Sequence, residues 1–87
     1  MLYRMEVRLT REAAADLERL PMVMKKRIQA VISRVQRWPD VSGVKPLTGT
    51  LAGHYRIRTG DYRMQFVLRD NILWIEKIGH RDGFYED

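Results

Sequence analysis

The chain has 87 residues, with 16 lysines and arginines against 11 aspartates and glutamates, and a formal net charge of +5. A chain of this length buries only about 60–65% of its unfolded surface, which argues for one thin core and against a deep catalytic chamber. The lack of cysteine excludes disulfides, cysteine zinc sites and thiol nucleophiles, and two histidines are too few for a histidine metal cage. We expect residues 1–87 to form a single domain that acts through an open face, with no cofactor and no bound metal.

The N-terminus lacks the apolar core of a signal peptide, and no stretch of the sequence is long enough and apolar enough to span a bilayer. A cytoplasmic protein with no membrane partner is therefore expected. The basic balance alone is compatible with nucleic acid, an acidic membrane surface or an acidic protein as the partner.

The first half of the chain predicts one strand and two helices. Residues 3–9 alternate apolar and polar side chains, as in a strand with one apolar face. Thr10 is a suitable N-cap for a helix over residues 11–20, and Pro21 ends that helix and can begin another. From residue 24 to residue 38 apolar side chains recur at helical spacing, which indicates an amphipathic helix over a core.

The second half predicts a connection and an antiparallel sheet. Residues 39–46 contain two prolines and a glycine and are expected to be a loop within the domain. Gly60-Asp61 fits a type II′ hairpin turn, and Asp70-Asn71 fits a second tight turn. The three strands that these turns join are residues 54–59, 62–69 and 72–78, the last closed by Gly79. The predicted fold class is α+β: an N-terminal strand, a two-helix hairpin and a three-stranded antiparallel meander that complete one sheet packed on the helices.

Arginines gather on one face of this predicted sheet. With Thr59 opposite Tyr62, alternation places Arg56, Arg58 and Arg63 together on the face away from the core. Arg58 then lies directly across from Arg63, and like charges so opposed cost about 0.2–1 kcal/mol. This arrangement favours a polyanion as the missing partner, and phosphate suits the planar, permanently charged guanidinium. The alternative is that the arginines only keep a solvated face soluble.

His80 and Arg81 follow the last strand directly. Histidine can donate a proton to a leaving group, and a neighbouring guanidinium can stabilise charge developing on a phosphate. We expect this pair to lie at the sheet end facing the arginines, with Tyr85 nearby as a surface on which an unpaired base could stack. A purely structural hydrogen-bonding role for His80, and packing of Tyr85 on the sheet, are the competing interpretations.

Several motifs together resemble one family. They are Lys45-Pro46-Leu47, then Gly53-His54-Tyr55-Arg56-Ile57-Arg58-Thr59-Gly60-Asp61-Tyr62-Arg63, then Ile78-Gly79-His80-Arg81, and finally Tyr85. In this combination the chain resembles, over nearly its whole length, the RelE/ParE superfamily of bacterial and archaeal toxins. The resemblance implies a RelE-like fold and a toxin of a type II toxin–antitoxin system. It also implies one of two activities, since RelE-like members cleave mRNA on the ribosome and ParE-like members poison DNA gyrase.

For a RelE-like member the resemblance implies a ribosome-dependent endoribonuclease, in which the RNA 2′-OH attacks the adjacent phosphate and the 5′-oxygen leaves. The residues implied to bind RNA are Lys45, Arg56 and Arg58. Those implied to carry the reaction are Arg63 and Arg81 on the phosphate, Tyr85 on the substrate and His80 in proton transfer. Some relatives have lysines where Arg56 and Arg58 stand here. Arginine stays protonated and is a poor general base, so the proton-transfer role is expected to fall to His80.

The resemblance also implies partners. These are a cognate antitoxin, with the basic helices and an apolar surface near Trp38 as expected contacts, the ribosome, and mRNA in its A site. The retained basic residues favour RNA cleavage over a ParE-like, non-enzymatic gyrase inhibitor. A degenerate toxin that only binds RNA or antitoxin is the third possibility, because arginine replaces the expected base.

Overall fold

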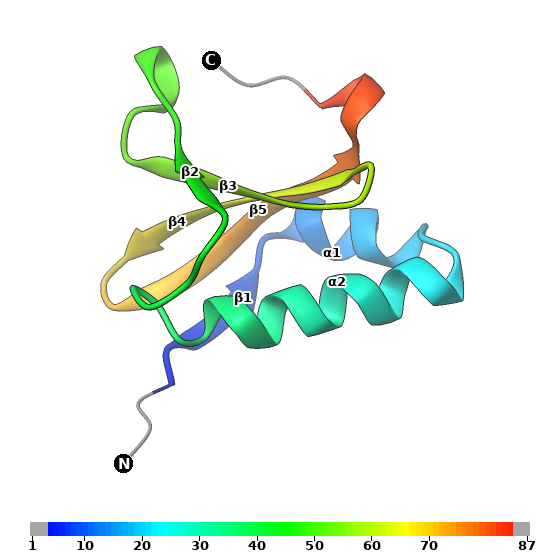
Figure 1. Ribbon diagram of the computed structural model, residues 1–87, viewed down its shortest axis with the longest axis horizontal. Coiled ribbons are helices and arrows are strands. Elements are labelled where there is room, and N and C mark those ends of the chain that lie inside the picture. The colour runs from blue at the N-terminus through cyan, green and yellow to red at the C-terminus, as the bar shows by residue number, and fades with distance from the viewer. Residues whose placement is uncertain (1–3, 85–87) are drawn as a thin grey trace.

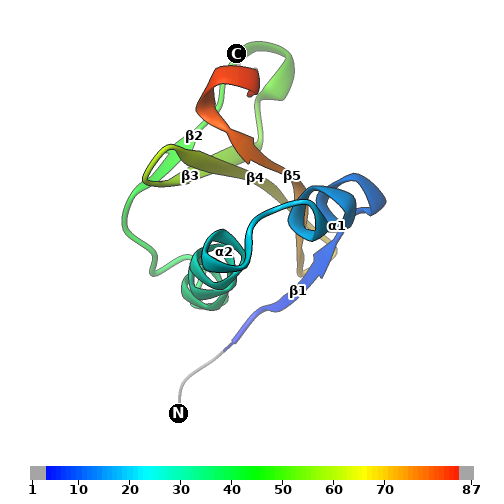
Figure 2. The same cartoon turned by 90° about the vertical axis from the view of Figure 1, so that its right-hand side faces the viewer.

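A computed structural model describes residues 4–84 and has one mixed sheet with two helices on one of its faces (Figures 1 and 2). The elements in chain order are β1 (Glu6–Leu9), α1 (Arg11–Glu18), α2 (Met22–Val35), β2 (Val44–Pro46), η1 (Gly49–Leu51), β3 (His54–Thr59), β4 (Tyr62–Arg69), β5 (Ile72–His80) and η2 (Arg81–Gly83). The strand order is β1-β5-β4-β3-β2, with β1 parallel to β5 and every other pair antiparallel. The expected α+β class is confirmed.

The sheet is larger than the predicted meander at both ends. β2 forms within the segment that was expected to be a loop, and it pairs with β3 at the edge of the sheet. Pro46 is compatible with this position because an edge strand leaves one row of backbone groups unpaired. β5 continues through Gly79 to His80, with Gly79 opposite Arg63, so the prediction that Gly79 closes the strand is wrong.

Both helices begin where local chemistry favours it. The Thr10 side chain accepts a hydrogen bond from the Ala13 backbone N–H at 3.1 Å, which confirms Thr10 as the N-cap of α1. α1 ends at Glu18, two residues before the predicted end. α2 begins directly after Pro21, as the fixed φ of proline favours at a helix start.

The core fills the space between the helices and the sheet. Its fully buried side chains include Ile28 and Val35 from α2 and Phe66 and Ile75 from the central strands. Trp38, just beyond α2, packs its ring 5.6 Å from that of Phe66, centroid to centroid. Trp38 is partly buried and packs against the core, so only part of its side chain contributes to the apolar surface that we expect as an antitoxin contact.

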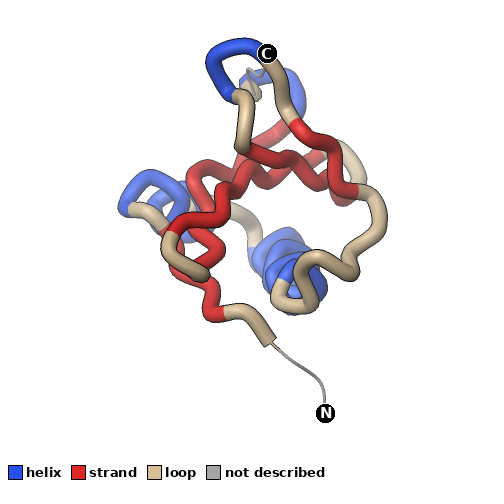
Figure 3. Tube along the Cα trace, turned by 90° about the vertical axis from the view of Figure 1, so that its left-hand side faces the viewer, coloured by secondary structure: helices blue, strands red, loops and turns tan. Residues whose placement is uncertain are grey.

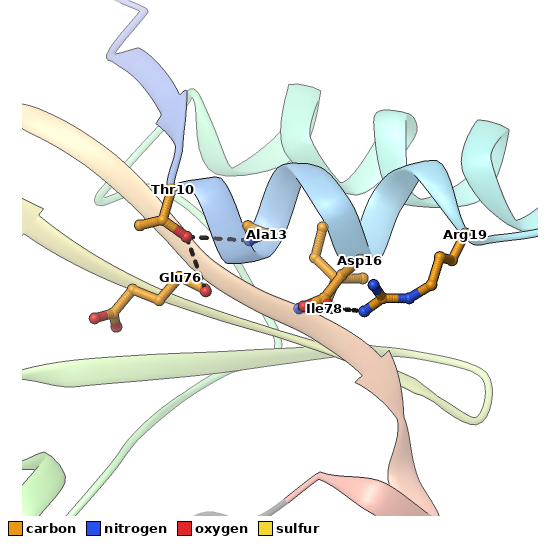
Figure 4. A network of polar contacts seen from close by, with 6 residues as sticks. All are labelled: Thr10, Ala13, Asp16, Arg19, Glu76 and Ile78. Carbon is orange, nitrogen blue, oxygen red and sulfur yellow. Dashed lines mark hydrogen bonds and ion pairs between the residues drawn. The ribbon is translucent and has the colours of Figure 1, made fainter.

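The helices α1 and α2 lie on one side of the strands, and the short η1 and η2 lie beyond the other side (Figure 3). α1 covers the edge of β5 where β1 ends. There the Asp16 carboxylate accepts a hydrogen bond from the Ile78 backbone N–H at 2.9 Å, and the Thr10 hydroxyl donates to the Glu76 carbonyl at 3.0 Å (Figure 4). These bonds satisfy backbone groups that would otherwise form an open sheet edge. None of the described helices is long and apolar enough to cross a membrane.

Candidate nucleic-acid interface

The sheet face away from α1 and α2, here called the outer face, carries most of the predicted site. Its polar residues include Lys45 from β2, His54, Arg56 and Arg58 from β3, Arg63 and Gln65 from β4, and Glu76 and Lys77 from β5. They alternate along the strands with buried core residues such as Ile57 and Met64. No α-helix within residues 4–84 covers this face (Figure 2).

The β3–β4 hairpin has the register that the sequence predicts. Thr59 pairs with Tyr62, and Arg58 lies directly across from Arg63. Gly60 has a φ of +59° and Asp61 does not have a positive φ, as a type II′ turn requires. The turn therefore fixes two like charges opposite each other on the outer face.

The basic residues on the outer face differ in exposure. Lys45 and Arg58 are exposed, whereas Arg63 is half-buried and its Nη1 is buried without a hydrogen bond to any described residue. Arg56 is only 7% exposed, so it contributes charge rather than a free guanidinium surface. Lys45, Arg58 and Arg63 form no ion pair within the described residues. Their charges therefore add to a positive field over the strands.

Arg81 joins the same end of the sheet. Its backbone N–H donates to the Asp61 carbonyl at 2.8 Å, which ties η2 to the β3–β4 turn. Its guanidinium nitrogens lie 3.8 Å from the Asp61 carboxylate and 3.6 Å from that of Asp82. Because these contacts are exposed, they compensate the charge of Arg81 only weakly. The structure thus gathers Arg58, Arg63 and Arg81 around one turn.

His80 does not face the arginines, which corrects the expectation drawn from sequence. It pairs with Tyr62 and contacts the Tyr62 ring edge-on, with centroids 5.5 Å apart. Paired residues share a face, and Tyr62 packs on the core with the helix-side residues. The residue across from Arg63 is Gly79, so His80 is one position out of phase with the arginine pair. Its Nδ1 accepts a hydrogen bond from the Asp82 backbone N–H at 3.2 Å.

An aromatic side chain does lie on the outer face near this end, but it is Phe84. A Cβ added to Gly79 would lie 3.5 Å from the Phe84 ring, and the Lys77 Nζ lies 4.4 Å from the ring centroid. The absence of a side chain at Gly79 leaves room for the ring. Tyr85, expected to stack on the substrate, lies outside the described residues.

Glu76 and His54 form a second polar cluster that sequence reasoning missed. β5 has a bulge here, because Gln65 pairs with Lys77 and Phe66 pairs with Ile75, which leaves Glu76 without a cross-strand partner. The Glu76 carboxylate lies 2.5 Å from His54 Nδ1 and accepts a hydrogen bond from the Gln65 side-chain amide at 3.1 Å.

A sequence signal for this bulge exists in β5. Ile75 and Ile78 are three residues apart and both are buried, whereas unbroken alternation would place them on opposite faces. One extra residue between them restores the pattern and places Glu76 on the outer face.

Comparison with known proteins decides the family. A family model described as the ParE toxin of the type II toxin–antitoxin system parDE matches residues 7–83. The chain belongs to this family. The expected membership of the RelE/ParE superfamily is thereby confirmed, and the chain is a toxin of the type II class.

Similar archaeal and bacterial proteins support this assignment. The chain is 26% identical over 85 residues to Toxin RelE3 of Methanocaldococcus jannaschii, covering 94% of this chain and 97% of that protein. A chain of the RelBE2 toxin–antitoxin complex of Mycobacterium tuberculosis is 30% identical with a TM-score of 0.79, covering 90% of this chain and 99% of that chain. A chain of the RelE–RelB complex of Pyrococcus horikoshii is 26% identical with a TM-score of 0.70, covering 97% and 100%.

Proposed function

We propose that this toxin is a ribosome-dependent endoribonuclease that cleaves mRNA in the A site and so inhibits translation. The observation that carries the proposal is the outer face, where Arg58 lies opposite Arg63 and neither has an acidic partner within the described residues. The repulsion between the two arginines destabilises the free protein, and a bound polyanion relieves it. A ribose-phosphate chain supplies that charge, and translating ribosomes present it as a single strand.

The arginines at the turn end suit the phosphate that reacts. When the 2′-oxygen attacks phosphorus, negative charge grows on the phosphate oxygens, and fixed cations stabilise that charge more than the ground state. We assign this role to Arg63 and Arg81. Arg58 binds the RNA strand beside them. Lys45, exposed on the edge strand, extends the positive surface along the RNA. Arg56 lies beneath this surface and acts through its charge.

The other residues implied by the family resemblance remain proposals. We assign Tyr85 to stacking on a base next to the cleaved phosphate. The Phe84 ring, which contacts Lys77, offers a second aromatic surface for a base. Proton transfer by His80 would require a substrate that reaches around the sheet end, because the imidazole lies on the helix side.

The proposed partners are the ribosome with its mRNA and a cognate antitoxin that binds and inhibits the toxin. The proposed location is the cytoplasm. The similar solved structures from M. tuberculosis and P. horikoshii are toxin–antitoxin complexes, which supports an antitoxin for this chain. The exposed basic residues of α2, Lys26 and Arg27 among them, offer a surface for an acidic antitoxin segment.

The second candidate is a non-enzymatic inhibitor of DNA gyrase. It is favoured by the family model, which carries the ParE description. The two functions differ in what they need from the outer face, since gyrase inhibition requires a protein contact and no phosphate chemistry.

Primer extension on an mRNA translated in a ribosome-containing extract tests the proposal. The wild-type toxin should give cuts with codon periodicity, and Arg63→Ala should slow cutting by roughly 100-fold or more, as loss of one charge-stabilising donor does. Arg37→Ala is the matched control, because Arg37 is exposed just beyond α2, away from the outer face. Equal cutting by the wild type and Arg63→Ala would refute the proposed site.

A further inference from the structure

Among the central strands β3, β4 and β5, only β5 places a carboxylate on the basic outer face, that of Glu76. The β5 bulge projects Glu76 onto this face, and its carboxylate bonds to the side chains of His54 and Gln65. Gln65 is only 6% exposed, and its amide oxygen is buried without a hydrogen bond to any described residue. The Glu76 carboxylate is therefore engaged by the imidazole of His54 and by the amide of Gln65.

The bulge is held from the helix side, so the position of Glu76 is fixed. Thr10 donates its backbone N–H to the Ile75 carbonyl at 2.9 Å and its hydroxyl to the Glu76 carbonyl at 3.0 Å. Asp16 binds the Ile78 N–H on the other side of the bulge. In Figure 4 the Glu76 side chain points away from α1 while its backbone is tied to Thr10. An exposed pair of long side chains would lack this support.

The contact decides which nitrogen of His54 is available. A carboxylate only accepts hydrogen bonds, so His54 Nδ1 carries the hydrogen that Glu76 binds, and the neutral ring keeps its lone pair on Nε2. His54 Nε2 forms no hydrogen bond within residues 4–84, and the His54 side chain is 23% exposed. The ring is thus oriented by a part-buried partner and is still reachable from solvent. This is the arrangement in which an acid positions a histidine for proton transfer.

We propose that His54 is the general base of this toxin and that Glu76 is its positioning residue. This inference rests on the proposed function. In the step, His54 Nε2 takes the proton of the RNA 2′-OH, the 2′-oxygen bonds to phosphorus, and the bond from phosphorus to the 5′-oxygen breaks. The 5′-oxygen takes a proton from solvent, and the imidazolium later returns its proton to solvent. The products are a 2′,3′-cyclic phosphate and a 5′-hydroxyl end.

The location of His54 suits this step. It is two residues from Arg56 on the same face of β3, a spacing of about 6–7 Å along a strand. Arg58 lies four residues from His54 along the same face, about 13 Å at strand spacing, so the reacting phosphate lies between the imidazole and the guanidinium groups of Arg58 and Arg63. Lys45, on the neighbouring strand, adds to the charge that attracts the RNA. The arginines cannot accept the proton, because guanidinium stays protonated. His54 therefore supplies the proton acceptor that the arginines of this face cannot provide.

The test is the cleavage rate of translated mRNA for His54→Ala and His54→Asn, with binding of a 2′-deoxy oligonucleotide measured in parallel. Loss of a general base lowers rates by about 100-fold to 10,000-fold. Both variants should fall in this range while binding stays within about twofold. Asn can still donate to Glu76 but cannot take the proton, so it separates structure from chemistry. Added imidazole should restore part of the activity of His54→Ala.

Glu76 is tested through its dependence on His54. Glu76→Gln alone should slow cleavage at least about tenfold, but Glu76→Gln added to His54→Ala should slow it no further, because a positioning residue acts only through the group it positions.

If the wild type cuts mRNA and His54→Ala cuts equally well, or imidazole fails to rescue a slow His54→Ala, the assignment of His54 is overturned and the proposed function stands. If the wild type cuts no mRNA, the proposed function itself fails, and the role of His54 with it. Additive losses for the double variant would overturn the role of Glu76.

Discussion

The repulsion between Arg58 and Arg63 predicts that Arg58→Glu stabilises the protein while it weakens RNA cleavage. The two residues are direct cross-strand partners, and Arg58 is exposed, so the substitution needs no repacking. Removing a like-charge pair and forming an opposite-charge pair are worth about 0.2–1 kcal/mol each. A net gain near the middle, about 1 kcal/mol, raises Tm by about 4–8 °C in a domain of this size. Thermal unfolding followed by circular dichroism measures it.

The control is Arg69→Glu, which changes the net charge equally. Arg69 is exposed on β4, the strand of Arg63, but lies opposite Ile72, so the Tm of the Arg69→Glu variant should change little. Because surface charges are screened within about 3 Å at 1 M salt, the gain for Arg58→Glu should shrink there. Equal effects of the two substitutions, or a gain unaffected by salt, would refute the account of the outer face as a site of uncompensated charge.

Three further substitutions test the fold and the site. Asp16→Ala leaves the Ile78 N–H without its acceptor and should lower the free energy of unfolding, measured in urea, by about 1–3 kcal/mol. Arg19→Ala removes only an exposed contact to Asp16 and should lower it by less than about 1 kcal/mol. Equal losses for the two variants would contradict this role of Asp16. Gly60→Ala places a side chain at a φ of +59° and should destabilise by about 1–3 kcal/mol, so an unchanged Tm would contradict the II′ turn. His80→Ala should keep most of the mRNA cleavage activity in primer extension. Loss of cleavage by this variant would instead support His80 as the proton-transfer residue.

The parts of the fold with strong local signals were predictable. The hairpin register follows from Gly60-Asp61 and from alternation on both strands, so the sequence alone predicts that Arg58 lies opposite Arg63, and the structure confirms it. The helix start at Thr10 followed from its capping chemistry. In each case the residues that decide the structure are neighbours in sequence.

The missed features depend on long-range pairing. β2 is three residues long and carries Pro46, so only its pairing with β3 identifies it as a strand. The bulge at Glu76 is fixed by Thr10, 66 residues earlier in the chain. The phase of His80 depends on whether the ladder continues past Gly79, which the glycine alone does not decide. The candidate base, His54, was overlooked because its partner Glu76 is distant in sequence and shares its face only through the bulge.

The most direct measurement compares the two candidate activities on one preparation of the wild-type toxin. It is incubated with translating ribosomes and mRNA, and separately with DNA gyrase and supercoiled DNA, and the cut ends are mapped in both. The account predicts codon-periodic mRNA cuts with a 2′,3′-cyclic phosphate upstream and a 5′-hydroxyl downstream, and no gyrase cleavage complexes. Gyrase cleavage complexes with intact mRNA would contradict it.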